Sequence, residues 1–237
     1  MKPHIKVIGF DADDTLWVNE EHYRNAEKQF VGLMEPWLTE REARKELFRI
    51  EMKNLGMYGY GAKGFTLSMI TAAISISNGQ AGSEVIAQII ELGSALINAP
   101  IKLLANVEDV LATLYKDYKL IVATKGDLLD QERKLGNSNL EKYFHHVEIM
   151  SDKNPDSYRK LVRHLDINAG EFLMIGNSLK SDVIPVLEIG SDAIHIPYHT
   201  TWAHEHVDDM TDFQPYMTLD GFSDLLEVFY RPGERGS

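Results

Sequence analysis

The stretch IKVIGFDADDTL, residues 5–16, decides the fold. Its first half is apolar except for Lys6, which is typical of a β-strand covered on both faces of a sheet. The strand ends at two acidic residues, Asp11 and Asp13, with one residue between them. Ligand sites of open α/β sheets form at the carboxyl ends of the strands. The stretch therefore predicts a buried strand that brings a pair of carboxylates to a binding site.

The chain that follows has helical periodicity as far as Pro100 and no convincing strand. Thr39 and Glu42 form the pattern of a capping box, and Gly56 is expected to end the helix that they start. Helices are predicted over residues 20–34, 39–55, 65–76 and 84–97.

After Pro100 strands and helices alternate. Asn106 is expected to cap the first helix of this part, and Gly136 to break the second. The predicted strands cover residues 119–123, 147–150, 172–175 and 193–197, and the predicted helices cover residues 107–116, 131–144, 155–165, a stretch up to 187, and 222–230. This alternation predicts a parallel sheet with right-handed crossovers. The fold class is thus α/β, with a Rossmann-like parallel-sheet core (residues 1–17 and 101–237) and an inserted all-helical cap domain (residues 18–100).

Length and charge narrow the range of partners. The chain has 237 residues, enough for one catalytic unit with a sizeable insert. It carries 24 Lys and Arg against 36 Asp and Glu, a formal charge of −12. The electrostatic field of such a negative chain repels polyanions, which argues against a nucleic-acid partner. No apolar run reaches the roughly 18 residues that span a bilayer, and the start lacks a secretory signal. We therefore expect a cytoplasmic protein without a membrane partner.

The sequence contains no cysteine, and this limits the chemistry. Disulfides, thiolate catalysis and zinc–thiolate sites are excluded, so any metal is held by oxygen or imidazole ligands. A phosphorylated substrate would be repelled at long range by the negative chain. Its site would need a local cation and a local lysine.

Polar residues follow four of the predicted strands, at residues 11–16 (DADDTL), 123–127 (ATKGD), 151–155 (SDKNP) and 176–182 (GNSLKSD). In these residues the chain resembles the haloacid dehalogenase-like superfamily. That superfamily has Asp-x-Asp-x-Thr after the first strand, Thr or Ser after the second, Lys before a proline-containing helix start, and a loop of the type Gly-Asp-Ser-x-x-x-Asp. All four motifs occur here in order and together cover the whole predicted core.

The acidic pair predicts the central chemistry. Paired carboxylates at one site are costly unless a cation relieves them, and Mg²⁺ is a hard cation that also binds phosphate oxygens. Asp11 is then expected to be the nucleophile that forms an aspartyl-phosphate. Asp13 is expected to protonate the leaving group and later to activate water. The resemblance implies that the backbone carbonyl of Asp13 also ligates the metal.

The other motifs predict the remaining site residues. The Thr124 hydroxyl and the Lys125 and Gly126 amides are suited to bind a phosphoryl oxygen. Thr15 is expected to hold the turn after the first motif through its hydroxyl. The resemblance implies that Lys153 neutralises the charge shared by the nucleophile and the phosphoryl group. Lys160 is the competing candidate, but it lies inside a predicted helix.

The fourth motif departs from the family pattern. Where the family has an acidic residue, this chain has Asn177, whose amide oxygen can still coordinate a cation but brings one negative charge less. Asp182 remains and is expected to anchor metal-bound water. The predicted metal residues are thus Asp11, Asp13, Asn177 and Asp182, and the substitution at Asn177 is expected to weaken Mg²⁺ binding.

Two weaker patterns favour ordinary structural roles. The glycine-rich residues 59–64 follow no predicted strand and lack the Gly-Lys-Ser/Thr ending of a phosphate loop, so we interpret them as a cap loop. Four histidines crowd one region without the spacing of a familiar zinc motif, so surface or packing roles are favoured for His195, His199, His204 and His206. No role is assigned to their neighbours Tyr198 and Trp202.

These features favour a magnesium-dependent phosphohydrolase that acts on a small phosphate ester. Within the superfamily that the chain resembles, 2-haloacid dehalogenases bind no metal and do not need a second acid. The presence of Asp13 therefore favours phosphoryl transfer. A phosphomutase is disfavoured, because the family of β-phosphoglucomutase typically has Gly where this chain has Asp14. A dehalogenase-like hydrolase and a non-catalytic binding module stay open as alternatives.

The insert between the first two motifs resembles the helical type 1 cap of phosphoglycolate-phosphatase-like and 5′-nucleotidase-like members. Substrate identity and oligomeric state, monomer or dimer, stay open.

Overall fold

The computed structural model describes residues 4–200, 202–205, 207 and 217–230. The chain forms two compact units. The first comprises Met1–Glu20, Ile101–Lys125 and Arg133–Ser237, and the second comprises Glu21–Pro100 and Gly126–Glu132. Within the described residues no helix is long and apolar enough to cross a membrane.

The first unit is built on a parallel sheet of six strands in the order β3-β2-β1-β4-β5-β6. The strands are β1 (Val7–Phe10), β2 (Lys119–Lys125), β3 (His146–Met150), β4 (Phe172–Gly176), β5 (Asp192–His195) and β6 (Met217–Thr218). The chain runs from β1 outward through β2 and β3, then returns to the other side of β1 with β4. The predicted α/β class with a Rossmann-like parallel sheet is confirmed.

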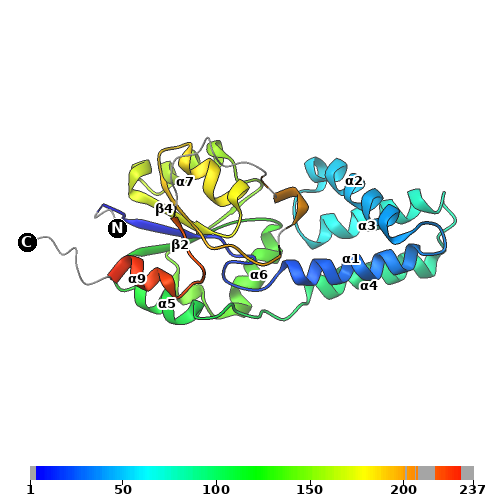
Figure 1. The fold of residues 1–237 in the computed structure, drawn as a ribbon, viewed down its shortest axis with the longest axis horizontal. Coiled ribbons are helices and arrows are strands. Elements are labelled where there is room, and N and C mark those ends of the chain that lie inside the picture. The colour runs from blue at the N-terminus through cyan, green and yellow to red at the C-terminus, as the bar shows by residue number, and fades with distance from the viewer. Residues whose placement is uncertain (1–3, 201, 206, 208–216, 231–237) are drawn as a thin grey trace, which may run out of the picture. The chain divides into compact units, whose positions relative to one another are not determined.

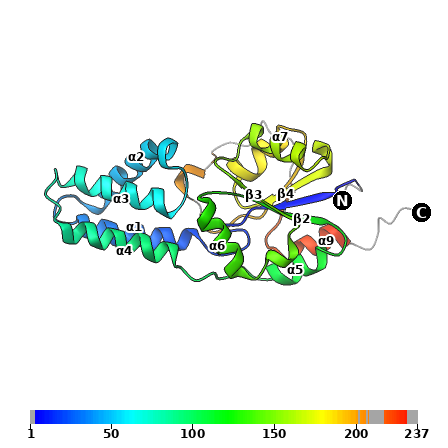
Figure 2. The same cartoon turned by 180° about the vertical axis from the view of Figure 1, so that it is seen from behind.

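Helices cover both faces of this sheet (Figures 1 and 2). On one face α5 (Val107–Leu114) and α9 (Asp224–Tyr230) lie against the strands, and on the other lies α7 (Pro155–His164). A π-helical turn (Leu179–Val183) leads into the short α8 (Ile184–Leu187), and α6 (Leu128–Ser138) passes from the second unit into the first.

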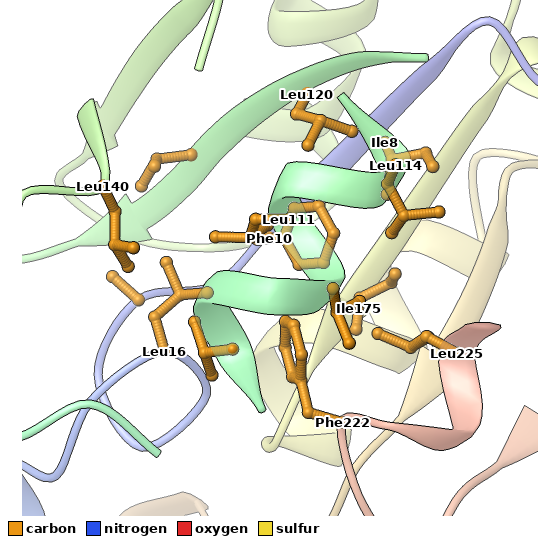
Figure 3. Close-up of a cluster of buried hydrophobic side chains, with 14 of the residues drawn as sticks. Ile8, Phe10, Leu16, Leu111, Leu114, Leu120, Leu140, Ile175, Phe222 and Leu225 are labelled. Carbon is orange, nitrogen blue, oxygen red and sulfur yellow. The ribbon is translucent and has the colours of Figure 1, made fainter. Parts of the chain in front are cut away.

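Strand alternation explains why the sheet has two cores. Successive side chains of a strand point to opposite faces. Ile8 and Phe10 of β1 therefore pack with α5 and α9, in the cluster of Figure 3 that also contains Leu111 and Leu225. Val7 of β1 instead joins the cluster under α7 and α8. Both faces are apolar, so the strands need unbroken apolar runs, which is the pattern seen at residues 5–10.

The second unit is helical. It contains α1 (Glu20–Met34), α2 (Glu40–Tyr58), α3 (Ala62–Ile76) and α4 (Ser83–Ile97), which lie alongside one another around a core that includes Phe30, Met34, Met69 and Ile89. The capping box is confirmed, since Thr39 Oγ1 accepts from the Glu42 amide and the Glu42 carboxylate accepts from the Thr39 amide.

Three local predictions were wrong. Helix α2 continues past Gly56 to Tyr58, because the residue with a positive φ that ends it is Gly59 (φ 70°). Gly136 lies inside α6, and the helix ends two residues later, before Asn139 adopts a left-handed φ of 58°. Asn106 precedes α5 but has φ 64° and makes no side-chain capping bond, so it serves the turn and does not cap the helix.

Candidate active site

The first and fourth motifs meet at the centre of the sheet. Asp11 follows β1 and Asn177 follows β4, and these two strands are paired in register from Val7↔Phe172 to Phe10↔Ile175. The Asp11 amide extends the ladder by donating to the Ile175 carbonyl at 2.9 Å. Since strand order reverses here, with β2 on one side of β1 and β4 on the other, this is the point where open α/β sheets form a ligand crevice.

Asp11 is held from two directions. Lys153 Nζ lies 2.5 Å from Asp11 Oδ1 and 2.6 Å from Asp182 Oδ1, so one ammonium bridges two carboxylates. Thr15 Oγ1 donates to the other oxygen, Asp11 Oδ2, at 3.2 Å. The side chains of Lys153 and Asp182 are each only 1% exposed, so the bridge is screened from water. Lys160, the competing lysine, is exposed on α7.

Lys153 reaches this position because of its place in the chain. It lies between β3 and α7, whose first turn contains Pro155 and whose N-cap Asn154 accepts from the Ser157 amide. Proline with its fixed φ suits the start of a helix, and the capping bond fixes where the helix begins. The lysine is thus presented at the carboxyl edge of the sheet by a defined strand–loop–helix unit.

Burial and charge act in opposition at this cluster. Burial raises the pKa of Asp11, to about 7, although the Lys153 ammonium lowers it. Burial also disfavours a charged Lys153, but Asp11 and Asp182 outweigh it and raise the lysine pKa. Lys153 therefore stays an ammonium ion. A further cation beside Asp11 would favour its carboxylate form.

The surroundings of the Asn177 amide suit two orientations of this group. One terminal atom of its amide lies 3.1 Å from Thr15 Oγ1, 3.3 Å from Asp11 Oδ2 and 3.3 Å from the Asp13 carbonyl oxygen. With its nitrogen there, the amide donates to these acceptors. With its oxygen there, three ligand oxygens converge. Mg–O bonds of about 2.1 Å in an octahedron place neighbouring oxygens about 3 Å apart. With the amide oxygen turned inward, its separations from Asp11 Oδ2 and from the Asp13 carbonyl oxygen are thus compatible with oxygen ligands of one ion.

The Asp182 carboxylate occupies the space that a side chain on Gly176 would fill. Its Oδ2 accepts from the Ser178 amide at 3.0 Å while Oδ1 holds Lys153. A Cβ on Gly176 would lie 2.3 Å from Asp182 Cγ, far inside van der Waals contact. Only glycine at this position leaves room for the carboxylate to approach the end of β4. The structure thus puts Asp182 on Lys153 and close to the predicted metal residues.

The carboxylate of Asp13 has partners that the sequence did not reveal. Trp17 Nε1 donates to Asp13 Oδ1 at 2.7 Å, and Lys134 Nζ lies 3.0 and 3.1 Å from its two oxygens. Lys134 also donates to Asn19 Oδ1 at 2.8 Å. Trp17 could have been found from the spacing, four residues after Asp13. Lys134 belongs to no motif and lies 121 positions away along the chain.

The second motif forms the end of β2. Thr124 is buried at 2% exposure, and Gly126 follows the strand with φ 143°, a conformation suited to glycine. The Lys125 ammonium donates to Ser181 Oγ at 2.9 Å and to the Glu205 carboxylate. The structure places Thr124 and Lys125 at the same sheet edge as Asp11, since β1 and β2 are paired.

Glu205 is a further residue of this region that the sequence did not predict. Its carboxylate accepts from Lys125, from Ser178 Oγ and from Ser181 Oγ, the last at 2.7 Å. Burial opposes the ionisation of Glu205, but Lys125 and the two hydroxyls outweigh it and lower its pKa to about 2. Glu205 therefore fastens the residues after β5 to the second and fourth motifs.

The weaker patterns have local explanations. The glycine-rich stretch is a loop only over Gly59–Gly61, since α3 begins at Ala62. His195 Nε2 contacts the Asn177 carbonyl oxygen at 3.0 Å. The other two described histidines of that region pack on rings, His199 on Tyr198 and His204 on Trp202, with centroids 4.2 and 4.8 Å apart. His206 lies outside the described residues.

Comparison with known proteins gives a consistent picture. The family model for haloacid dehalogenase-like hydrolases matches residues 5–190. A crystal structure of a haloacid dehalogenase-like family hydrolase from Xanthomonas campestris is 41% identical, covers 82% of each chain and has a TM-score of 0.79. The structure of a Bacillus subtilis protein described as a HAD-hydrolase, YfnB, bound to magnesium, covers 96% of this chain and 99% of its own, with 14% identity and a TM-score of 0.65. At that identity the likeness shows a common fold alone.

One curated relative is a nucleotidase. The pyrimidine 5′-nucleotidase PynA of Streptococcus pneumoniae (strain ATCC BAA-255 / R6) is 30% identical over 131 residues, which are 52% of this chain and 53% of that protein. The match therefore spans only about half the length of that relative.

Proposed function

Since the chain belongs to the haloacid dehalogenase-like hydrolase family, we propose that it is a magnesium-dependent phosphohydrolase that acts on a small phosphate ester through an aspartyl-phosphate at Asp11. The family is one of hydrolases, so the chain is a hydrolase of this family. Its relatives include a nucleotidase.

The observation that supports the finer proposal is the approach of two oxygens, from Asp11 and Asp13, to the Asn177 amide. Asp11 Oδ2 and the Asp13 carbonyl oxygen both lie 3.3 Å from one terminal atom of the Asn177 amide. Phosphoryl transfer needs a cation next to the nucleophile, because the attacking carboxylate and the phosphate repel each other. A dehalogenase reaction has no such requirement. This arrangement therefore favours phosphoryl transfer over dehalogenation.

The residues divide the reaction between them. The Asp11 carboxylate attacks phosphorus, and the leaving oxygen takes a proton from Asp13; water then attacks the aspartyl-phosphate and gives a proton back to Asp13. Lys153 offsets the charge that builds up between Asp11 and the phosphoryl group. Thr15, Thr124 and the amides of Lys125 and Gly126 orient phosphoryl oxygens. Asp182 holds Lys153 and would also anchor water on the ion. Asp11, Asp13 and Asn177 would hold the magnesium ion, which would supply positive charge to the phosphate oxygens.

Two further parts of the proposal come from the sequence and the relatives. Residues 18–100 act as a helical type 1 cap for a core made of residues 1–17 and 101–237. Pyrimidine nucleoside monophosphates are the first substrates to test, because of the match to the nucleotidase. A cytoplasmic location and the expectation of neither nucleic-acid nor membrane partners stay predictions, as do all statements on oligomeric state.

Hydrolysis of para-nitrophenyl phosphate and of a panel of nucleoside monophosphates, with and without MgCl₂, tests the proposal. We expect turnover that requires Mg²⁺ and is lost in Asp11→Asn. Asp156→Asn is the matched control, since that side chain is 82% exposed and pairs only with the surface residue Arg159 in the contacts described. Chloride release from 2-haloacids without Mg²⁺ would indicate a dehalogenase. The absence of turnover on every ester would favour a binding module.

A further inference from the structure

A group of two histidines and one glutamate, separate from the residues around Asp11, has the geometry to hold a metal ion. His146, Glu148 and His164 each offer one ligand atom, and these atoms all lie within 4.8 Å of one another. His146 Nε2 is 2.9 Å from Glu148 Oε2, and His164 Nδ1 is 3.8 Å from the same oxygen. Within the described part of the chain, this is the one group of three or more such residues that is close enough to hold an ion.

The three side chains converge because of strand pairing. In the parallel ladder His146 lies opposite Ile121 and Glu148 opposite Ala123. Ile121 and Ala123 belong to the apolar cluster under α7, so His146 and Glu148 point to the face of the sheet that α7 covers. His164 is the last residue of α7.

The backbone on both sides of the group is fixed by packing. Leu161 and Val162 of α7 and Met150 of β3 are buried in the same cluster. The ligating side chains stay open to solvent, with His146 32%, Glu148 30% and His164 68% exposed. A rigid framework that carries accessible ligands is what an ion can enter without reorganising the fold.

The donor set identifies the class of ion. Two imidazoles and one carboxylate are ligands of Zn²⁺ and of similar transition-metal ions, whereas Mg²⁺ prefers oxygens. Tetrahedral bonds of about 2.0–2.2 Å place ligand atoms about 3.4 Å apart. The 2.9 and 3.8 Å separations at Glu148 lie on either side of this value.

We propose that His146, Glu148 and His164 form a second cation site, of the zinc type, with its fourth position open to solvent. The site joins β3 to the end of α7, on either side of the loop that carries Lys153. An ion bound there would tie down both ends of the segment that presents this lysine. The site does not depend on the proposed phosphatase activity.

Zinc chloride titration by calorimetry, in buffer with excess MgCl₂ to fill the oxygen site, tests the proposal. We expect one Zn²⁺ per chain in the wild type and in Asp11→Asn. His164→Gln and Glu148→Gln are expected to bind at least about tenfold more weakly, because even the loss of a hydrogen-bond partner behind a ligand costs 10–100-fold. His145→Gln is the control, since this exposed neighbour packs on Tyr115 outside the group.

Three results would overturn the proposal: no saturable Zn²⁺ binding in the wild type, equal binding in His164→Gln, or loss of binding in Asp11→Asn alone. Should Glu148→Gln fail to fold, His164→Gln still decides, because its side chain is mostly exposed. The ring ¹⁵N chemical shifts of His146 and His164 give a second readout, and both must move when Zn²⁺ is added.

Discussion

Lys153 Nζ lies 2.5 Å from Asp11 Oδ1, although 142 positions separate the two residues in the chain. Asp182 Oδ1 accepts a second hydrogen bond from the same ammonium group at 2.6 Å. All three side chains are at least nine-tenths buried. A buried ammonium shared by two carboxylates leaves one net negative charge, which a divalent ion beside Asp11 can offset.

Lys153→Met is expected to lower kcat by about 10²–10³-fold, because the charge that develops on the phosphoryl group loses its buried counterion. The same change leaves Asp11 and Asp182 without their shared partner, so the free energy of unfolding should fall by about 3 kcal/mol. Steady-state hydrolysis and urea unfolding measure the two effects. Lys160→Met, at an exposed position of α7, should alter neither. Equal activity of the two variants would remove Lys153 from the mechanism.

Asn177→Asp is expected to tighten Mg²⁺ binding at least about tenfold, because it adds a negative charge next to Asp11 Oδ2 and the Asp13 carbonyl oxygen. Without Mg²⁺ the same charge should destabilise the protein, since a further carboxylate then faces Asp11. Calorimetry with MgCl₂ and thermal unfolding with and without the ion measure both effects. Asn78→Asp adds the same charge at an exposed turn and should change neither. Unchanged Mg²⁺ affinity would mean that Asn177 does not face the ion.

The parts of the site that could be predicted are those that belong to short sequence motifs directly after apolar runs. Asp11, Lys153 and Asn177 each follow a strand whose apolar run is visible in the sequence, and Thr124 lies near the end of such a strand. Parallel strands bring their carboxyl ends to one edge, so their convergence follows from the fold class alone.

The contacts that could not be predicted depend on distant residues without a pattern. Lys134 reaches Asp13 from α6, and Glu205 reaches Lys125 over 80 positions. Charged residues on helices and loops are common, and nothing local distinguishes these two from solvated ones. The two-residue strand β6 was missed for a related reason, since Met217–Thr218 is too short to show alternation. The group at His146, Glu148 and His164 needs the pairing of α7 with the sheet, which spacing does not reveal.

Glu205→Gln is expected to lower the free energy of unfolding by up to about 3 kcal/mol near pH 6. The folded-state pKa of Glu205 is lowered to about 2, from an ordinary value of 4.5. A carboxyl group with a depressed folded pKa stabilises the protein above pH 4.5, and this contribution is lost as the pH falls toward 2. The stability difference between wild type and Glu205→Gln should therefore shrink below pH 4.5, by about 1.4 kcal/mol per pH unit.

Urea unfolding at pH 6, 5, 4 and 3.5 measures the effect of Glu205→Gln. Glu188→Gln, at an exposed position in the same unit, should track the wild type at every pH. A stability difference that stays constant with pH would show that the contacts of Glu205 with Lys125, Ser178 and Ser181 do not depend on its charge.

Gly176→Ala and Gly136→Ala are expected to act in opposite directions. A Cβ at Gly176 would lie 2.3 Å from Asp182 Cγ, so the carboxylate must move away from Lys153 or β4 must shift. We expect a loss of about 1–3 kcal/mol in the free energy of unfolding, together with a fall in kcat. A Cβ at Gly136 meets nothing within 4 Å inside α6, where alanine favours the helix by about 0.5–1 kcal/mol.

Urea unfolding and steady-state kinetics on the two alanine variants separate packing from a general effect of losing glycine. Gly136→Ala should be more stable than the wild type with unchanged kcat, because position 136 lies in a regular helix with room for a methyl group. Adding MgCl₂ should not restore Gly176→Ala, since the steric conflict is with Asp182 itself. A stable and active Gly176→Ala variant would show that Asp182 can leave Lys153 at no cost, and that the bridge from Asp11 through Lys153 to Asp182 does not hold the site together.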